Sequence, residues 1–256
     1  MLTVIASTKT QKTALLADVP ATQPALLAQT ATLVKHLQSL DQEELAHLLG
    51  ISDRLAETTR QRYARFRLPH ETDTAGSVLL SFTGDVFTAM QPQRFGADEL
   101  RFANHHLRVL SGLYGILRPF DLMQPYRLEM GTTGSIGPET NLYRYWQDAI
   151  TAQLNEALKD HPERMVVNCA SLEYSRAIRR DHLAADLITM TFRQQVRGTV
   201  KTVPIHAKKA RGLFVNWLIT NRIDTKAQLH QFDRQGYHFV EQLSTDDEIV
   251  FLTESP

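Results

Sequence analysis

Three cationic side chains lie close together in one short segment of the chain, at Lys208, Lys209 and Arg211. We predict a basic helix over residues 207–222, in which Lys208 and Arg211 are three positions apart and share a face, whereas Lys209 points elsewhere. Positive charge near a helix N-terminus opposes the helix dipole, and a bound anion would offset that opposition. The segment therefore indicates a phosphate-binding patch. The alternative is a solvated basic face, which is the commoner outcome for a run of charges.

Polar residues follow a buried-type strand that we predict over residues 165–169. They are Asn168, Ser171 and Glu173, and a helix is expected directly after them. Because ligands collect beyond the carboxyl ends of strands in α/β sheets, these three side chains are candidate ligand contacts. The alternative is that Ser171 caps the helix and Glu173 occupies its favourable first turn. The residues alone leave both interpretations open.

A stiff, charged loop follows residue 117, and Pro119 and Pro125 restrict its backbone. Such a loop can hold polar groups in fixed positions over a pocket. An ion-pair network that only pins the loop is an equal alternative. The side chains concerned are Arg118, Asp121, Tyr126, Arg127 and Glu129.

Two glycines, Gly112 and Gly115, punctuate the segment before this loop. A helix, a glycine turn and a second helix start would make a helix-hairpin-helix-like element, whose backbone N–H groups approach a nucleic-acid phosphate. The spacing departs from the usual hairpin by one extra residue, Tyr114, which would re-aim these donors. A helix ended by a C-cap glycine and a tight turn is the alternative, and spacing alone favours it. Gly112 and Gly115 are thus candidate phosphate-binding positions.

Familiar signatures of catalysis and metal binding are missing from the sequence. It contains no nucleophile elbow, no phosphate-binding lysine loop, no dinucleotide-binding glycine motif and no pair of cysteines. The ten histidines are scattered, and the adjacent pair His105 and His106 diverges around a helix by a quarter-turn or more. That divergence makes a poor chelate. We therefore predict no metal site and no cofactor.

Helical and strand-like apolar patterns alternate along the chain, which predicts an α/β fold, with mixed α+β possible. Within a helical stretch over residues 24–66, Asp41 with Glu44 is a helix start signal, Gly50 is a stop and Ser52 can cap the next helix. No linker or repeat divides the chain, so we expect one domain over residues 1–256, with a mixed sheet flanked by helices. Strands are expected over residues 2–6, 77–82, 165–169, 187–194, 199–206, 237–240 and 248–252, and further helices over 96–110, 141–158 and 207–222.

The composition narrows the class of protein. The formal net charge is zero, which excludes a globally basic nucleic-acid binder, so a phosphate-binding surface has to be local. One cysteine, Cys169, cannot form an internal disulfide and suits a reducing cytoplasm. No apolar stretch approaches the roughly 18 residues of a membrane span. We expect a cytoplasmic protein without membrane contact, and we favour a monomer.

Taken together, these segments resemble the YaaA family of peroxide-stress proteins. The resemblance extends over essentially the whole chain, and the central stretch over residues 110–131 is nearly verbatim. It implies a cytoplasmic bacterial protein induced by hydrogen peroxide that limits free intracellular iron and so protects DNA and proteins. It also implies a single-domain fold with a positively charged cleft, a helix-hairpin-helix-like element and DNA binding.

The resemblance also places twelve of this chain's residues at family motif positions. The first motif departs from the family pattern, because the family usually has Ser-Pro-Ala-Lys where this chain has Ala6-Ser7-Thr8-Lys9. The serine hydroxyl is lost at Ala6, and the lysine is kept. The twelve positions are Lys9, Asp85, Arg118, Tyr126, Arg127, Glu129, Asn168, Ser171, Glu173, Lys208, Lys209 and Arg211.

Two functional hypotheses follow. The first is a DNA-binding stress protein of weak sequence specificity, with Gly112 and Gly115 presenting backbone donors and five side chains contacting phosphates. The second is an enzyme acting on a small anionic or nucleotide-like substrate, in which a desolvated Lys9 is nucleophile or base and Glu129 or Glu173 is its proton partner. Direct iron sequestration ranks last. The phosphate contacts would be Arg118, Arg127, Lys208, Lys209 and Arg211, and the enzyme cleft would add Asp85, Tyr126, Asn168 and Ser171.

Overall fold

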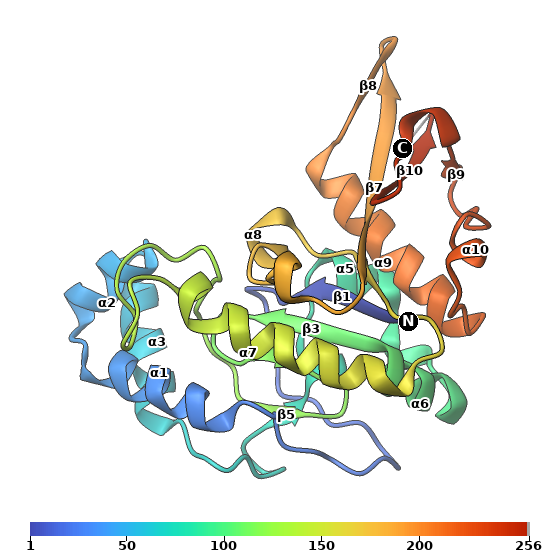
Figure 1. Ribbon diagram of the computed structural model, residues 1–256. Coiled ribbons are helices and arrows are strands. Elements are labelled where there is room, and N and C mark those ends of the chain that lie inside the picture. The colour runs from blue at the N-terminus through green and yellow to red at the C-terminus, as the bar shows by residue number, and fades with distance from the viewer. Residues whose placement is uncertain (255–256) are drawn as a thin grey trace.

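A mixed β-sheet runs through the middle of the molecule in the computed structural model, which describes residues 1–254 (Figure 1). Five neighbouring strands are parallel, in the order β3, β1, β6, β7 and β10. Three shorter strands pair antiparallel: β4 with β3, β8 with β7 and β9 with β10. The bounds are β1 (Leu2–Ala6), β3 (Leu107–Ser111), β4 (Gly115–Leu117), β6 (Met165–Asn168), β7 (Asp186–Val196), β8 (Thr199–Lys201), β9 (His238–Phe239) and β10 (Glu248–Thr253).

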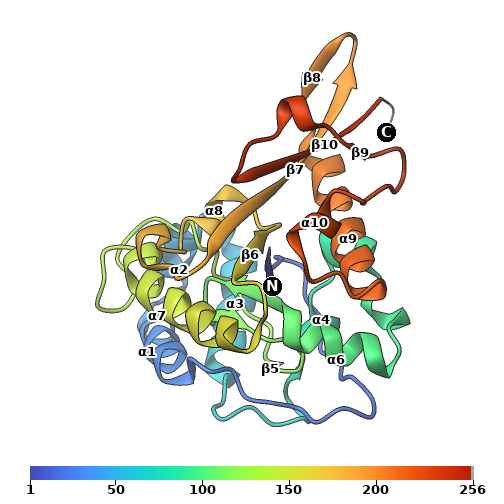
Figure 2. The same ribbon diagram turned by 45° about the vertical axis from the view of Figure 1, so that its right-hand side comes forward.

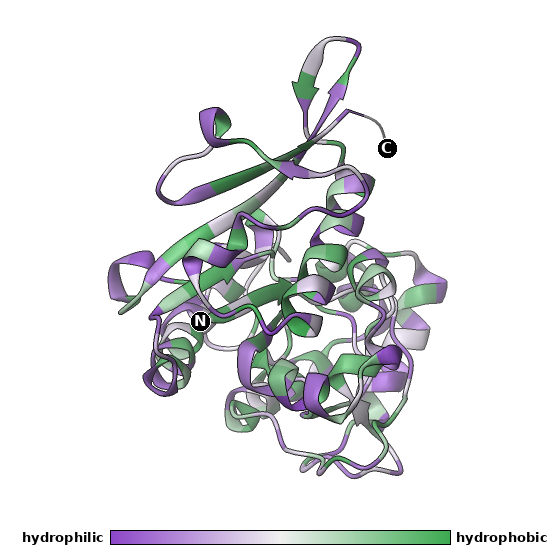
Figure 3. Ribbon diagram, turned by 90° about the vertical axis from the view of Figure 1, so that its right-hand side faces the viewer, coloured by the Kyte–Doolittle hydropathy of each residue, from purple (hydrophilic) through white to green (hydrophobic). Residues whose placement is uncertain are grey.

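The central strands are buried on both faces of the sheet. Leu2, Val4 and Ile5 of β1 are completely buried, as are Val166 and Val167 of β6. An unbroken apolar run is what a parallel strand covered on both faces requires. Figure 3 shows these strands as mainly hydrophobic, whereas the surrounding helices alternate between hydrophobic and hydrophilic residues.

Helices cover both faces of this sheet. Helix α7 (Leu142–Ala157) lies on one face, and α5 (Asp85–Met90), α6 (Ala97–His106) and α9 (Pro204–Thr220) lie on the other (Figures 1 and 2). Helices α5 and α9 touch at backbone level, because a Cβ atom on Gly212 would stand only 2.2 Å from the carbonyl oxygen of Val86.

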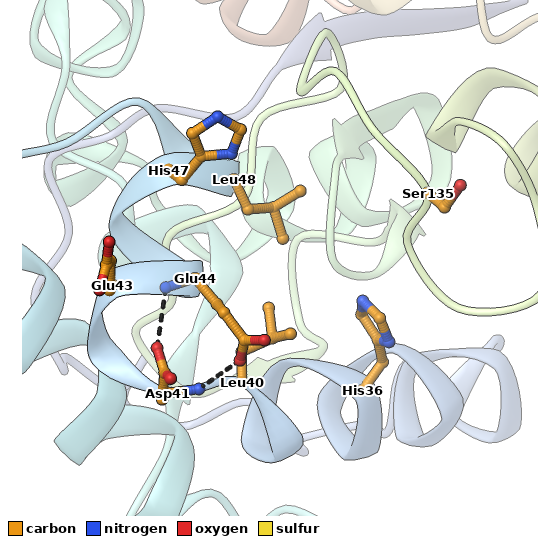
Figure 4. A pocket seen from close by; sticks show the side chains of 8 residues that line it. All are labelled: His36, Leu40, Asp41, Glu43, Glu44, His47, Leu48 and Ser135. Carbon is orange, nitrogen blue, oxygen red and sulfur yellow. Dashed lines mark hydrogen bonds between the residues drawn. The ribbon is translucent and has the colours of Figure 1, made fainter.

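Three helices near the N-terminus follow their local signals closely. They are α1 (Leu27–Ser39), α2 (Gln42–Leu49) and α3 (Asp53–Arg65). The predicted start of α2 is confirmed as a reciprocal capping box, in which Asp41 accepts from the backbone N–H of Glu44 and Glu44 accepts from that of Asp41 (Figure 4). Gly50 ends α2 in the left-handed conformation, with φ of 59°. Ser52 occupies the N-cap position of α3, although its side chain makes no capping bond.

Two predicted elements are wrong. The stretch over residues 77–82 is not a strand: only β2 (Gly76–Ser77) is extended, and α4 (Val78–Ser81) is one helical turn. The helix predicted over residues 96–110 ends at His106, and the rest is β3. Both segments are short and mainly apolar, and their few polar residues, Ser77, Ser81 and Arg108, do not define a period. A buried strand and a buried helical turn therefore look alike in sequence.

The glycine segment is a β-hairpin, so the helix-hairpin-helix prediction is wrong. Strands β3 and β4 pair antiparallel, with Ser111 opposite Gly115. A Cβ atom on Gly112 would lie 2.4 Å from the carbonyl oxygen of Leu128, and Gly115 has φ of 70° and packs against Trp146. These glycines permit close packing inside the protein. Their positions are buried, which removes their backbone groups from an incoming phosphate.

Most other predicted elements are confirmed with shifted ends. Asn141 caps α7 by accepting from the backbone N–H of Arg144, 3.0 Å away. The predicted hairpin is β7–β8, which projects from the body of the molecule in Figure 1, and α9 begins at Pro204 rather than at residue 207. The remaining elements are β5 (Leu122–Met123), α8 (Leu172–Ser175), α10 (Lys226–Leu229) and short 3₁₀ helices at Pro92–Arg94, Leu158–Asp160, Arg180–His182 and Glu241–Leu243.

The buried hydrophobic residues form one continuous core on both faces of the sheet. The predicted single-domain α/β architecture with a mixed sheet is therefore confirmed. Within residues 1–254, no helix combines the length and the apolar character that crossing a membrane requires.

Candidate functional site

The candidate site lies where β1 and β6 end side by side. The chain leaves β1 to form β3 on one side of it, and later returns to form β6 on the other side. This change of direction makes a crevice at the carboxyl ends of the two strands, where α/β proteins usually bind ligands. The loop over residues 7–10 follows β1, and the turn over residues 169–171 follows β6.

A cleft of about 510 Å³ opens at this crevice. It brings together seven of the predicted site residues, from the N-terminal loop, α5, the 118–131 loop, the start of α8 and α9. The seven are Lys9, Asp85, Glu129, Ser171, Glu173, Lys208 and Arg211. As predicted for a helix with three-residue spacing, Lys208 and Arg211 share the face that lines the cleft, and Lys209 is not part of this lining.

The charges in this cleft are balanced. Its lining has three cationic side chains (Lys9, Lys208, Arg211) and three anionic ones (Asp85, Glu129, Glu173), so a positively charged cleft is not confirmed here.

The closest pair of opposite charges in the cleft joins Lys9 to Glu129. Lys9 Nζ lies 2.8 Å from Glu129 Oε1, and the Lys9 side chain is 59% exposed. The expectation that Lys9 is desolvated is therefore wrong, because its side chain is exposed and paired with Glu129.

Glu173 and Ser171, which follow β6, differ in their contacts. Glu173 Oε1 accepts a hydrogen bond of 3.0 Å from the backbone N–H of Gly131 and so holds the end of the charged loop. Ser171 occupies the N-cap position of α8, but its side chain makes no capping hydrogen bond. The capping interpretation of the Ser171 side chain is wrong, and Ser171 is among the residues that line the cleft.

Two buried tyrosines, Tyr126 and Tyr174, lie at the cleft and the small cavity beside it. Tyr126 is 2% exposed, and its hydroxyl lies 2.7 Å from Ser111 Oγ. The hydroxyl of Ser7 donates to that of Tyr174 at 3.2 Å. Burial raises the pKa of Tyr126 to about 12 and raises the pKa of Tyr174 as well. Both phenols stay neutral at physiological pH, and they position the loops rather than supply a base.

The single thiol of the chain is buried and unreactive. Cys169 lines the cleft but is 1% exposed, and burial raises the pKa of its thiol to about 12, with the nearby Arg211 opposing that rise. Because the thiolate is the form that reacts with peroxide, Cys169 is unsuited to sensing it.

A second cavity of about 330 Å³, which we call the arginine pocket, adjoins the cleft. Arg176, Arg180 and Arg211 line it, and no acidic side chain is among its lining within residues 1–254. Asn168 lies here, where its amide donates to Thr189 and accepts from the backbone N–H of Ala170. The exposed Arg180 has a partner at the rim, 3.3 Å away, in Asp247.

Arg211 belongs to the cleft and to the arginine pocket at once. Its Nε atom is buried and has no hydrogen-bond partner in the described part of the chain. Burial lowers the pKa of this guanidinium. A buried, unpaired cationic donor is costly unless something binds it, so Arg211 is suited to an anionic oxygen.

The other predicted phosphate contacts lie outside these two cavities. Arg118 pairs with Asp121 at 2.8 Å and donates to it from its backbone N–H, so this part of the charged loop is the pinning network that was the alternative. Arg127 lies beside Lys9 and Glu129 in a very small adjoining cavity, and its Nε atom is buried without a partner among residues 1–254.

Sequence reasoning missed several residues of the site. Arg176 follows the end of α8 and Arg180 begins a separate 3₁₀ helix, so no shared helical face and no local spacing marks them in the sequence. Ser7 was passed over because its hydroxyl has no local motif. Ala6 also lines the cleft, so the hydroxyl lost there is missing from the cleft wall.

A cavity of about 450 Å³ between α1 and α2 contains none of the predicted site residues (Figure 4). His36 comes from α1 and His47 from α2, and the acidic residues beside them belong mainly to the cap of α2. We interpret this cavity as a gap left where α1 and α2 join.

Comparison with known families finds a match that spans most of the chain. The family described as peroxide stress protein YaaA matches residues 1–243. This range includes all the strands of the sheet except β10 and every residue named above in the cleft.

Proposed function

The chain belongs to the family of the peroxide stress protein YaaA, and on that premise we propose that it acts in the cytoplasm during peroxide stress, limits free iron and binds nucleic-acid phosphates at the arginine pocket. The observation that supports phosphate binding is Arg211, whose buried Nε lacks a partner while two further arginines line the same pocket. Planar guanidinium groups match the oxygens of a phosphate in paired hydrogen bonds.

The balanced charge of the whole molecule fits this arrangement. With a formal net charge of zero, attraction to a polyanion has to come from a local patch. The exposed Arg176 and Arg180 extend the pocket to the surface, and Lys208 lies one turn before Arg211 on α9. Contacts to phosphates carry no base sequence information, so binding is weakly sequence-specific and strongly salt-dependent.

Fluorescence anisotropy with labelled duplex and bulged DNA over a range of salt concentrations tests this binding. Arg176→Gln should weaken binding to all sequences alike and lower the slope of log affinity against log salt by about 1. Arg144→Gln is the matched control, because Arg144 is exposed on α7 and is not among the residues that line the pocket. Equal affinity and slope in the Arg176 variant and the wild type would refute the role of the arginine pocket.

The iron-limiting part of the proposal is tested in cells. Free iron in peroxide-treated cells, measured by electron paramagnetic resonance, should be lower with the wild-type protein than without it. The same signal in both strains would refute this part alone, since it does not depend on DNA binding.

A second candidate function is catalysis on a small anionic substrate in the cleft. The cleft is of the size that small molecules occupy, and the pair of Lys9 and Glu129 sets a proton donor beside a proton acceptor at its edge. We would incubate the protein with a cell metabolite extract and follow consumed and bound compounds by mass spectrometry. Lys9→Met should abolish any turnover and Lys12→Met should leave it intact, because Lys12 is exposed and outside the lining. Turnover that survives Lys9→Met would refute this candidate.

A further inference from the structure

Three histidines meet at the opposite end of the sheet from the cleft. His105 and His106 end α6 directly before β3, and His161 lies shortly before β6. Because β3 and β6 both run parallel to β1, these residues gather at the amino ends of strands whose carboxyl ends face the cleft. One potential ligand atom from each ring lies within 4.8 Å of the others.

The sequence argument against a chelate considered only the adjacent pair. His105 and His106 do diverge on their helix, but their ring centres are still 4.8 Å apart. The third ring stands opposite both of them: the His161 ring centre is 4.3 Å from that of His105 and 4.7 Å from that of His106. The fold thus supplies the ligand that the local spacing lacked.

Neighbouring groups hold the rings of His106 and His161 in place. His106 is stacked on Phe102, with ring centres 3.9 Å apart, and its Nδ1 lies 2.9 Å from the carbonyl oxygen of Met1. A backbone carbonyl that accepts from Nδ1–H fixes the ring and leaves Nε2 free to bind a metal, which is the usual support of metal-bound histidines. His161 is 5% exposed, and its buried Nδ1 has no partner within residues 1–254.

The charged groups beside the cluster have both signs. The carboxylate of Asp224 acts on the His106 ring, and the N-terminal ammonium acts on His106 and on His161. Arg108 adds a second positive charge near His161. The convergence of the three rings, and not the surrounding charge, therefore favours coordination at this place.

We propose that His105, His106 and His161 bind one divalent first-row transition metal ion, of the kind represented by Zn²⁺ and Fe²⁺. Imidazole nitrogens suit these ions, and three of them with an open position for water form a common coordination set. Metal–nitrogen bonds of about 2.0–2.1 Å in a tetrahedral site place the nitrogens about 3.3–3.4 Å apart. Each ring has to move inward by less than about 1 Å from the observed triangle.

The position of the rings also gives the ion a path. His105 is exposed, His106 is half-buried and His161 is buried, so the cluster extends from the surface inward. An ion can bind His105 first and then lose water as the deeper rings replace it. Removal of His105 therefore tests the site without disturbing the core.

The test uses full-length protein that carries no histidine tag, because the N-terminus lies beside His106. Co²⁺ is the spectroscopic probe: bound by three imidazoles it gives intense visible absorption that titrates to one ion per chain. Equilibrium dialysis with Zn²⁺, and with Fe²⁺ without oxygen, measures the affinity for each ion. His105→Gln and His161→Gln should each weaken binding by at least about tenfold.

His47→Gln is the matched control, because His47 is exposed on α2 and belongs to no three-ligand cluster in the described chain. One ion per chain, weakened in both cluster variants and unchanged in His47→Gln, is the expected result. Absence of saturable binding, or binding that both cluster variants retain, would overturn the proposal. If His161→Gln does not fold, His105→Gln alone decides. The DNA-binding and free-iron tests do not depend on this outcome.

Discussion

Replacement of Gly112 by alanine separates the two interpretations of the glycine segment. An added Cβ atom would stand 2.4 Å from the carbonyl oxygen of Leu128 and 2.9 Å from the carbonyl carbons of Leu128 and Glu129. These are backbone atoms, so no side chain can rotate away to make room. The loop that carries Glu129 would have to move, although Gly112 is also held by Trp146, whose Nε1 donates to its carbonyl oxygen at 2.8 Å.

The size of this clash sets the expected loss of stability in Gly112→Ala. Overpacking a well-packed core costs typically about 1–3 kcal/mol, and a backbone obstacle places Gly112→Ala at the upper end, at about 3 kcal/mol. Each kcal/mol shifts the melting temperature by about 2–4 °C in a domain of roughly this size, so we expect a melting temperature about 6–12 °C below that of the wild type.

Thermal unfolding followed by circular dichroism measures the shift, and Gly96→Ala is the matched control. A Cβ atom on Gly96 would meet nothing closer than Glu99 Oε2 at 3.8 Å, and its φ of −75° suits alanine. The control should lose at most about 1 kcal/mol, as expected for alanine at an N-cap. If Gly112→Ala melts with the wild type but binds DNA poorly, Gly112 acts as a phosphate donor and the packing argument is refuted.

Three further predictions follow from single buried groups. Burial lowers the pKa of His70 from 6.5 to about 4, so the folded state binds a proton on this ring less readily than the unfolded state does. Above pH 6.5 the ring is neutral in both states, and the free energy of unfolding falls by about 3 kcal/mol as the pH is lowered from 6.5 toward 4. His70→Gln should flatten the fall of the unfolding free energy in that window, as measured by urea titration, and an unchanged slope would contradict this account. Asp121→Ala should destabilise the protein by about 3 kcal/mol in the same assay, because it removes a 1% exposed carboxylate that accepts from Arg118 and Thr22. As a control, Asp148→Ala breaks an exposed ion pair with Arg179 and should lower the free energy of unfolding by at most about 1 kcal/mol. Iodoacetamide should label Cys169 in native protein at pH 8 far more slowly than in unfolded protein, because its thiol is buried with a pKa near 12, and equal rates would show that the thiol is accessible.

Local signals predicted the parts of the fold that local forces determine. Asp41 and Glu44 form their capping box because both partners lie within one turn, and Gly50 stops α2 because its left-handed conformation needs no distant contact. The segments over residues 78–81 and 107–110 were mispredicted because only tertiary packing separates a buried helical turn from a buried strand. Gly112 and Gly115 were misread for a related reason: close packing and phosphate approach both require glycine, and only the neighbouring backbone distinguishes them.

The site was predictable in its location and less so in its chemistry. Residues that follow strands, such as Lys9 and Ser171, converge because parallel strands end at one edge of the sheet. The sequence left the partner of Lys9 open between Glu129 and Glu173, and the structure pairs it with Glu129, a choice that depends on how a long loop folds back. The convergence of His161 on the end of α6 likewise depends on the order of the strands, which no local spacing encodes.

The backbone contact between α5 and α9 bears on how the cleft moves. Asp85 begins α5, and Lys208 and Arg211 belong to α9, so these two neighbouring helices both contribute to the cleft wall. At Gly212 they approach too closely for a Cβ atom, which leaves no layer of side chains along which they could slide. Hinge or shear closure of this wall would have to break a close-packed contact. We therefore expect the cleft to keep one shape with and without its ligand, so that association rates depend on diffusion and charge rather than on the opening of a lid.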